Sequence, residues 1–287
     1  MPYRGLFVGL TTLDFIYLSD RSVTANQKVV AQDYLTVSGG PATNAAVTFN
    51  SFGDRSKLLS VIGKHPLTKL IQDDLNRHSV LSMDLMPDRS ETPAVSSIVV
   101  TASTGERSII SINAVKSQVE SKIEANLLDD IDLVLVDGHQ LDVSVQIAAI
   151  AKKQKIPVIL DGGSWKSGLE RLLEFVDYAI CSANFYPPRC QQREEVFNFL
   201  TKYGIDRIAI TQGEKAIQYL DREIRGAIEV PKIEAVDTLG AGDIFHGAFC
   251  HYILLENFTR ALELAAKTAS HSCLFFGTRS WLGRSPK

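Results

Sequence analysis

The stretch with the most potential for chemistry is Asp237-Thr238-Leu239-Gly240-Ala241-Gly242-Asp243. Its small residues are followed by an apolar helical pattern, which predicts a turn leading directly into a helix. The first N–H groups of such a helix have no partner, and they lie at the positive end of its dipole. The turn could therefore hold a phosphate group through the backbone of Gly240, Ala241 and Gly242. Asp243 could take a proton from a nearby hydroxyl, and together these groups predict phosphoryl transfer to an alcohol.

A purely structural interpretation competes with this one. Glycine-rich turns before helices are common, and an aspartate there often serves only as an N-cap. The longer context favours a functional site, because Gly247 inside the predicted helix permits another backbone or a nucleotide to approach closely.

The same stretch resembles the D-T-x-G-A-G-D signature of the ribokinase/PfkB family of carbohydrate kinases. A second motif, Ser38-Gly39-Gly40-Pro41-Ala42-Thr43-Asn44, is similar to the family's G-G-x-x-x-N element beside the sugar. The resemblance extends from Gly5 to about Arg279. Within the family the sequence looks most like the ketohexokinase and sulfofructose kinase branch, as the C-terminal Gly277-Thr278-Arg279 also indicates.

Strand and helix patterns alternate along the chain. Short apolar runs predict buried strands at 6–10, 58–62, 133–136, 158–160, 178–181 and 208–210. Helical patterns lie near 41–52, 67–78, 142–154, 191–203, 242–256 and 259–273. This alternation predicts an α/β fold with a mainly parallel sheet. The resemblance implies a ribokinase-like three-layer αβα sandwich formed by residues 1–287 as a single domain.

Two segments depart from this alternation. Residues 11–37 and 92–112 alternate polar and apolar side chains, which predicts the half-exposed strands of a small antiparallel sheet. The resemblance implies that these strands form a lid over the sugar. Lids of this kind can pair between subunits, so a homodimer is expected by analogy alone.

Composition excludes several classes of function. The chain has 287 residues, 45% of them hydrophobic, and a net charge of −3, which gives no bulk attraction to nucleic acid or anionic membranes. No apolar run reaches the ~18 residues that span a bilayer. The four cysteines form no CxxC pair, so reduced thiols and a cytoplasmic location are expected.

The candidate sugar site lies in the N-terminal half. Asp14 follows the first predicted strand, and its carboxylate suits paired hydroxyl donors. The resemblance assigns it to sugar hydroxyls, together with Gly39, Gly40 and Asn44. It also implies contacts from two lid residues, Arg107 and Asn113. Asp14 as a lid-turn residue and Arg107 as a solvated strand residue stay open as alternatives.

The candidate nucleotide site matches the family less well. Asn184 fits the family's N-x-x-E element, but Pro187 replaces its glutamate, which puts the usual magnesium arrangement in doubt. Further candidates are Thr211 and Gly213, in a T-x-G-x-x-G element whose last glycine is Ala216, and His271 and Gly277. The resemblance implies a metal role for Asp161 near the phosphates and a monovalent cation such as K⁺ beside Asp237, while a plain turn competes at Asp161.

These observations predict an ATP-dependent sugar kinase that uses Mg²⁺ and a small sugar, with a ketohexose or related sugar as acceptor. The sequence has no GxxxxGK[ST] loop and no GxGxxG after its first strand. One rival is a nucleoside kinase of the same fold. The other is a sugar-binding regulator with decayed catalysis, which Pro187 and Ala216 favour and the intact Asp243 opposes.

Overall fold

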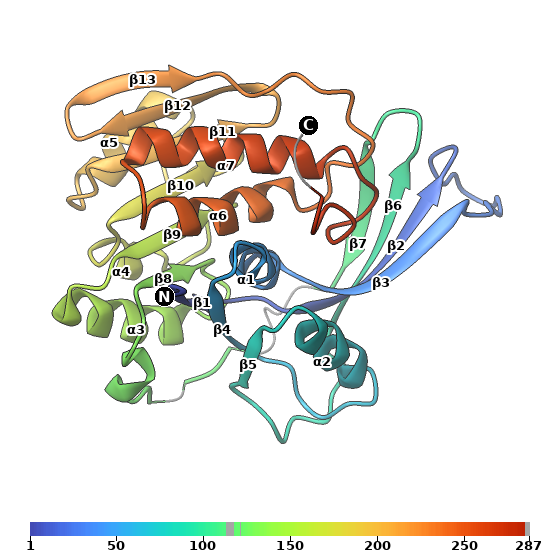
Figure 1. Ribbon diagram of the computed structural model, residues 1–287, viewed down its shortest axis with the longest axis horizontal. Coiled ribbons are helices and arrows are strands. Elements are labelled where there is room, and N and C mark those ends of the chain that lie inside the picture. Colours follow the sequence, from blue (N-terminus) through green and yellow to red (C-terminus); the bar gives the residue numbers. More distant parts are fainter. Residues whose placement is uncertain (113–117, 121, 285–287) are drawn as a thin grey trace.

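The computed structural model describes residues 1–112, 118–120 and 122–284, and its arrangement is shown in Figure 1. The larger sheet has the strand order β13-β12-β11-β10-β9-β8-β1-β4-β5. Every pairing from β11 to β5 is parallel, whereas β12 and β13 pair antiparallel. The strands are β1 (Arg4–Val8), β4 (Arg55–Ser60), β5 (Leu81–Asp84), β8 (Leu133–Val136), β9 (Val158–Gly162), β10 (Tyr178–Ser182), β11 (Arg207–Gln212), β12 (Lys215–Asp221) and β13 (Ile224–Ile228).

Helices cover both faces of this sheet. One core cluster joins it to α1 (Pro41–Ser51), α2 (Thr68–Arg77), α6 (Ala241–Tyr252) and α7 (Phe258–Ser272). The cluster on the other face joins it to α3 (Leu141–Gln154), α4 (Glu170–Leu173), α5 (Arg193–Thr201) and the 3₁₀ turn η2 (Ala125–Leu128). The expected three-layer α/β fold is confirmed, and each predicted strand and helix has a counterpart.

The smaller sheet extends away from these layers, at the right of Figure 1. Its order is β3-β2-β6-β7, and β2 pairs antiparallel with β3 and parallel with β6, while β6 and β7 form an antiparallel hairpin. The strands are β2 (Thr12–Ser19), β3 (Asp33–Gly39), β6 (Ala94–Thr101) and β7 (Arg107–Ser111). Both polar–apolar segments of the sequence therefore form this sheet, and the parallel β2–β6 pair joins them.

Local sequence explains where the elements begin. The four residues of β8 are all buried, as expected for a strand covered on both faces. Helix α5 starts with a capping box formed by Gln192 and Glu195, and the Asn257 side chain caps α7 by accepting from the Arg260 N–H at 2.9 Å. Since the strands are parallel, their carboxyl ends meet at one edge, where α1 and α6 also begin.

Helices α1 and α6 pack unusually closely at Gly247. A Cβ atom at that position would lie 2.3 Å from the carbonyl oxygen of Ala45 on α1. No side chain fits this gap without moving the two helices apart, and these helices carry the candidate residues Asn44 and Asp243.

We expect Gly247→Val to destabilise the protein by about 2–3 kcal/mol, the range of an overpacked core site. Urea unfolding followed by circular dichroism measures this change. Gly53→Asn is the matched control, because Gly53 has a positive φ of 89° that asparagine tolerates and open space beside it. A Gly247→Val protein as stable as the control would contradict the close contact.

No helix in the described part of the chain combines the length and apolar character that a membrane span requires.

Candidate active site

Residues Gly240, Ala241 and Gly242 form a turn before α6, called the glycine turn here, which is open toward solvent. Gly240 adopts a left-handed conformation (φ 69°) and accepts the first helical hydrogen bond from the Ile244 N–H at 2.8 Å. A Cβ built on Gly242 would meet nothing within 4 Å. The Ala241 N–H donates to the Thr238 carbonyl at 3.4 Å. Open space beside Gly242 thus meets the positive end of the α6 dipole, which is an arrangement suited to an anion.

Asp237 holds the glycine turn in place through hydrogen bonds to the backbone. Its buried carboxylate accepts the N–H of Leu239 through one oxygen and the N–H of Gly277 through the other, both at 2.8 Å. Burial raises the pKa of Asp237, although both N–H groups and Arg107 oppose the shift. Asp237 thus ties the turn to the C-terminal segment.

Asp243 lies in the first turn of α6, partly buried beneath the glycine turn. Its Oδ2 accepts a hydrogen bond of 2.7 Å from Nδ2 of Asn44, a residue 199 positions away in the sequence. Burial raises the pKa of Asp243 to about 7, and the negative charge of Asp161 adds to this effect. A carboxylate with this pKa is suited to act as a base near neutral pH.

Arg279 is a site residue that our sequence analysis missed. Its Nη1 donates to Oδ1 of Asn44 at 2.8 Å and its Nη2 donates to the Ser38 carbonyl at 2.6 Å. Burial lowers the pKa of Arg279, and the carboxylates of Asp74, Asp14 and Asp243 oppose this shift. The Gly277-Thr278-Arg279 stretch was a signal for it, although we used that stretch only as a mark of family.

Gly39 lies directly against Asp14, and Gly40 lies against the backbone of Leu10. Asp14, on β2, is buried and accepts a hydrogen bond of 2.6 Å from the Thr12 hydroxyl. A Cβ at Gly39 would lie 1.9 Å from Oδ2 of Asp14, and one at Gly40 (φ 97°) would lie 2.3 Å from the Leu10 carbonyl oxygen. Burial raises the pKa of Asp14, while Thr12, Ser96 and Arg279 oppose the shift. Only glycines permit this approach, which brings backbone beside a carboxylate.

Asp161 lies near the carboxyl end of β9, at the same edge of the sheet. Its Oδ2 lies 3.5 Å from Nδ1 of His246, and this oxygen is buried without a hydrogen-bond partner among the described residues. Burial raises the pKa of Asp161, and His246 opposes the shift. His246 contacts two carbonyl oxygens, at Gly242 (2.7 Å) and Ile180 (3.1 Å), so both ring nitrogens can donate only when the ring is protonated.

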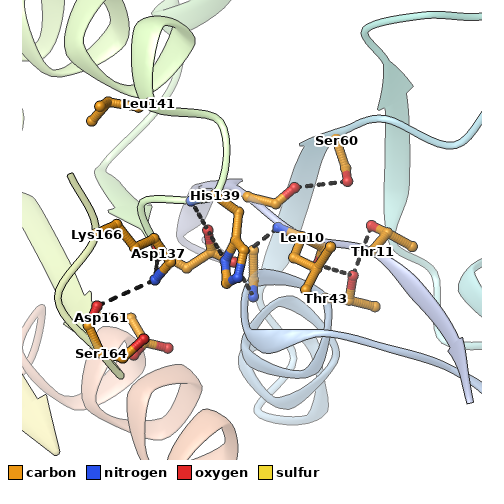
Figure 2. A network of polar contacts seen from close by, with 12 residues as sticks. Leu10, Thr11, Thr43, Ser60, Asp137, His139, Leu141, Asp161, Ser164 and Lys166 are labelled. Atoms are coloured by element: carbon orange, nitrogen blue, oxygen red, sulfur yellow. Dashed lines mark hydrogen bonds and ion pairs between the residues drawn. The ribbon is translucent and has the colours of Figure 1, made fainter. Parts of the chain in front are cut away.

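Figure 2 shows a second network, centred on Asp137 at the end of β8. The Asp137 carboxylate accepts the N–H groups of Leu10 (2.8 Å), His139 (2.9 Å) and Ala42 (3.3 Å). Burial alone would raise its pKa, but His139, Lys166 and the Leu10 N–H together lower the pKa of Asp137 to about 2.

Asp137 therefore stays ionised and ties β1, β8 and α1 together beneath the site. Our sequence analysis also missed this residue. Its signal was an acidic residue directly after the apolar run 133–136, the same pattern that revealed Asp161.

Arg107 connects the smaller sheet to the glycine turn. Its Nη1 donates to the Thr238 hydroxyl at 2.8 Å and to the Thr238 carbonyl at 3.2 Å, while its side chain remains exposed. The Thr238 hydroxyl in turn donates to the Gly105 carbonyl at 3.2 Å. The smaller sheet thus contacts the turn directly. The other sugar-contact candidate of this segment, Asn113, lies outside the described residues.

The nucleotide candidates lie on several elements. Thr211 pairs in register with Ser182, and Asn184 follows two residues later, so these residues and the turn at Gly213 (φ 61°) share one end of β10 and β11. Gly277 is buried against Asp237, beside the glycine turn. His271, near the end of α7, lies 2.9 Å from the carbonyl of Arg284 through its Nε2. A shared nucleotide site that joins these two residues to the first group stays a prediction.

Metal ligands are sparse at this edge. Among the residues that the structure describes, no cluster of three or more His, Cys, Asp or Glu side chains could hold a metal ion. Asp161 fits a metal-linked role, because it has a buried carboxylate oxygen without a partner. Each oxygen of Asp237 accepts one backbone N–H and keeps one lone pair, so a monovalent cation such as K⁺ beside Asp237 stays a prediction.

Comparison with known proteins agrees with this geometry. The chain is 25% identical over 294 residues to a ribokinase of Lactococcus lactis, with 98% of this chain and 93% of that protein covered. A putative ribokinase from Agrobacterium tumefaciens has the same fold (TM-score 0.87, 24% identity, 98% and 94% of the two chains covered). Ribokinase from Arabidopsis thaliana, solved with ribose and ATP, also shares it (TM-score 0.79, 22% identity, 96% and 94% covered). Residues 5–282 match the family model for pfkB family carbohydrate kinases, and the chain therefore belongs to that family of phosphotransferases acting on sugar hydroxyls.

Proposed function

We propose that this protein transfers the γ-phosphoryl group of ATP to a hydroxyl of a small sugar, with Asp243 as the base. The observation that carries this proposal is the contact between Asp243 and Asn44 beside an open glycine turn. A base with a pKa near 7, a carboxylate suited to sugar hydroxyls at Asp14 and a turn suited to an anion belong to one set of connected residues. These are the groups that phosphoryl transfer to an alcohol requires.

The two oxygens of Asp243 have different tasks in this mechanism. Oδ2 accepts from Asn44, which fixes the carboxylate, whereas Oδ1 has no hydrogen bond within the described part of the chain. Oδ1 takes the proton of the sugar hydroxyl. The hydroxyl oxygen bonds to the γ-phosphorus as the bond between that phosphorus and ADP breaks. The N–H groups of Ala241, Gly242 and Asp243 stabilise the negative charge that spreads over the transferring group. Arg107, which contacts Thr238, can add a fixed positive charge.

The acceptor lies against Asp14, Gly39 and Gly40. The Asp14 carboxylate accepts hydrogen bonds from two hydroxyls of the sugar. Burial raises the pKa of Asp14, and these hydrogen bonds offset the cost of burying its carboxylate. A ketohexose or a related sugar suits this set of groups. Ribose is a strong alternative acceptor, because the relative from Arabidopsis was solved with ribose and ATP.

Magnesium is proposed to arrive with ATP, whose phosphate oxygens supply most of its ligands and whose charge it partly neutralises. Asp161 is the described carboxylate best placed to hold its water ligands, because one oxygen lacks a partner. Asn184 and Gly213 line the proposed nucleotide side. A monovalent cation such as K⁺ beside the glycine turn remains part of the proposal, with Asp237, whose oxygens each keep one lone pair, as its candidate ligand.

A homodimer through the smaller sheet is the proposed assembly. Large apolar side chains are exposed on its two outer strands and just beyond, with Tyr34 at 68%, Ile110 at 80% and Ile112 at 69% of their full exposure. Exposed edges with apolar side chains favour pairing with a second copy. Sedimentation at micromolar concentration is expected to show a dimer that Ile110→Lys weakens, and a wild-type monomer would contradict this assembly.

Asp243→Asn is expected to lower kcat by about 10²–10⁴-fold, because the amide cannot accept the hydroxyl proton. ADP formation is measured across a panel of ribose, ketohexoses, sugar acids and nucleosides. One sugar should stimulate the wild type well above its activity with nucleosides. Asp73→Asn, an exposed aspartate on α2, is the matched control and should keep wild-type turnover. Near-normal kcat for Asp243→Asn would refute this base, and a nucleoside as the best acceptor would refute the sugar assignment.

The pH dependence of kcat/KM tests the electrostatics of this base. Since Asp243 acts only when deprotonated, the rate should rise with pH through an inflection near the pKa of about 7 and level off above it. Removing the negative charge of Asp161 with Asp161→Asn should lower the pKa of Asp243 and move the inflection to lower pH. Carboxyl-carbon NMR of the free protein measures the same pKa without substrate. An unchanged inflection would show that Asp161 does not act on the base.

A further inference from the structure

The segment that follows α7 contacts both sides of the proposed site. Gly277 donates its N–H to Oδ2 of Asp237, the residue that holds the glycine turn, at 2.8 Å. A Cβ built on Gly240 of that turn would lie 2.7 Å from Cγ2 of Thr278. The next residue is Arg279, whose side chain contacts the acceptor side and the partner of the base instead. These consecutive residues therefore lie between the glycine turn and the groups that position the acceptor.

This segment has little freedom to move. Gly277 has a positive φ of 79°, and a Cβ there would lie 2.3 Å from a methyl carbon of Leu35 on β3. The indole N–H of the buried Trp281 donates to the Thr278 carbonyl at 3.1 Å. Nη1 of Arg279 also donates to the Thr278 hydroxyl, at 3.0 Å. These contacts fix the position of the guanidinium relative to the glycine turn.

The guanidinium determines the orientation of the Asn44 amide. Nη1 of Arg279 donates to Oδ1 of Asn44 at 2.8 Å, and Nδ2 of Asn44 donates to Oδ2 of Asp243 at 2.7 Å. A guanidinium has only donors, and an ionised carboxylate has only acceptors. The reverse orientation of the amide would place donor against donor and acceptor against acceptor, so both neighbours exclude it. Without Arg279, the contact with Asp243 alone would hold the amide.

The same guanidinium holds the backbone beside the acceptor. Its Nη2 donates to the Ser38 carbonyl at 2.6 Å. Oδ2 of Asp74 accepts the Ser38 N–H at 3.0 Å and the Ser38 hydroxyl at 2.6 Å, and it lies 3.7 Å from Nε of Arg279. Ser38 is thus held through its N–H, its hydroxyl and its carbonyl. It directly precedes Gly39, whose backbone lies against Asp14.

These contacts require the shape of a guanidinium as well as its charge. The two Nη nitrogens contact acceptors on different elements, Asn44 on α1 and Ser38 on β3. A guanidinium is planar and presents its donors in a rigid fork, whereas a lysine ammonium is a point charge on a flexible chain. Lysine at position 279 would keep the charge beside Asp74 but lose the fixed geometry between the two acceptors.

We propose that Arg279 is a positioning residue for phosphoryl transfer: it fixes the Asn44 amide and, through that amide, the orientation of Asp243. It also fixes the Ser38 carbonyl and so the backbone that leads into Gly39. The guanidinium acts through these residues rather than on the reacting atoms. The catalytic part of this inference rests on the proposed function, whereas control of the Asn44 amide does not.

The first experiment needs no substrate. NMR of the isotope-labelled free protein measures hydrogen exchange of the Asn44 side-chain amide. Arg279→Lys should speed this exchange by about tenfold or more, because the amide loses a hydrogen bond that holds it in place. The matched control is Arg77→Lys, the same change at an exposed arginine of α2, which should leave the exchange rate unchanged. Equal exchange in the wild type and a folded Arg279→Lys protein would overturn the proposal.

The second experiment measures ADP formation with the preferred sugar. Arg279→Lys should lower kcat by about 10²-fold, the effect of a misplaced catalytic group, while Arg77→Lys keeps wild-type turnover. Arg279→Ala leaves a space shaped like the missing group, so added guanidinium should restore part of its kcat. The same guanidinium should not restore Asp243→Asn. Circular dichroism separates a misplaced base from a lost fold, and a folded Arg279→Lys enzyme with normal kcat would contradict the positioning role.

A double-mutant cycle tests whether Arg279 acts through Asn44. If it does, Arg279→Lys should lower kcat far less in an Asn44→Ala protein than in the wild type, because the connection to Asp243 is already missing. A purely structural arginine would give the same loss in both proteins, and that result would overturn the proposal. A wild type that phosphorylates no sugar would refute the proposed function instead, and the amide exchange would still decide whether Arg279 controls Asn44.

Discussion

The contact between Asn44 and Asp243 depends on a single buried guanidinium. Arg279 donates to Asn44 and to the Ser38 carbonyl, and its Nε faces Asp74, with a side chain that is only 9% exposed. A buried cation is stable only when acceptors and carboxylates surround it. The groups that meet this need come from β3, α1 and α2, so the charge of Arg279 joins segments that are far apart in the sequence. Removing the guanidinium would leave the side-chain Oδ1 of Asn44 and the Ser38 carbonyl without this donor, and would remove the positive charge beside Asp74.

Close backbone approaches make this arrangement possible. Gly39 brings β3 against Asp14, Gly40 brings α1 against the end of β1, and Gly247 brings α6 against α1. At each of these positions the absence of a side chain lets two elements that carry site residues come close together. The result is that Asn44 and Asp243 lie within hydrogen-bond distance although they begin different helices. The glycines of both sequence motifs therefore serve packing between elements as well as contact with a ligand.

The sequence predicted the parts of the fold that depend on local pattern. Buried apolar runs located the strands from β1 to β11 that pair in parallel, and alternation located the smaller sheet. The short β5 and the antiparallel pair β12 and β13 were not predicted, because the first is four residues long and the others follow a turn at Gly213. The motifs located Asp243, Asn44 and Asp14, whereas Arg279 and Asp137 act through long-range contacts that no local spacing reveals.

The role of Asn44 is clear when the observed contacts are compared with a direct ion pair between Arg279 and Asp243. If Arg279 contacted Asp243 directly, its charge would stabilise the carboxylate and lower the pKa of Asp243, which would weaken it as a base. Asn44 lies between them, accepts from Arg279 and donates to Asp243, so the orientation of the carboxylate is fixed by a neutral amide. Burial and Asp161 can then raise the pKa to about 7. An asparagine at this position therefore transmits the position of Arg279 to the base through a neutral amide.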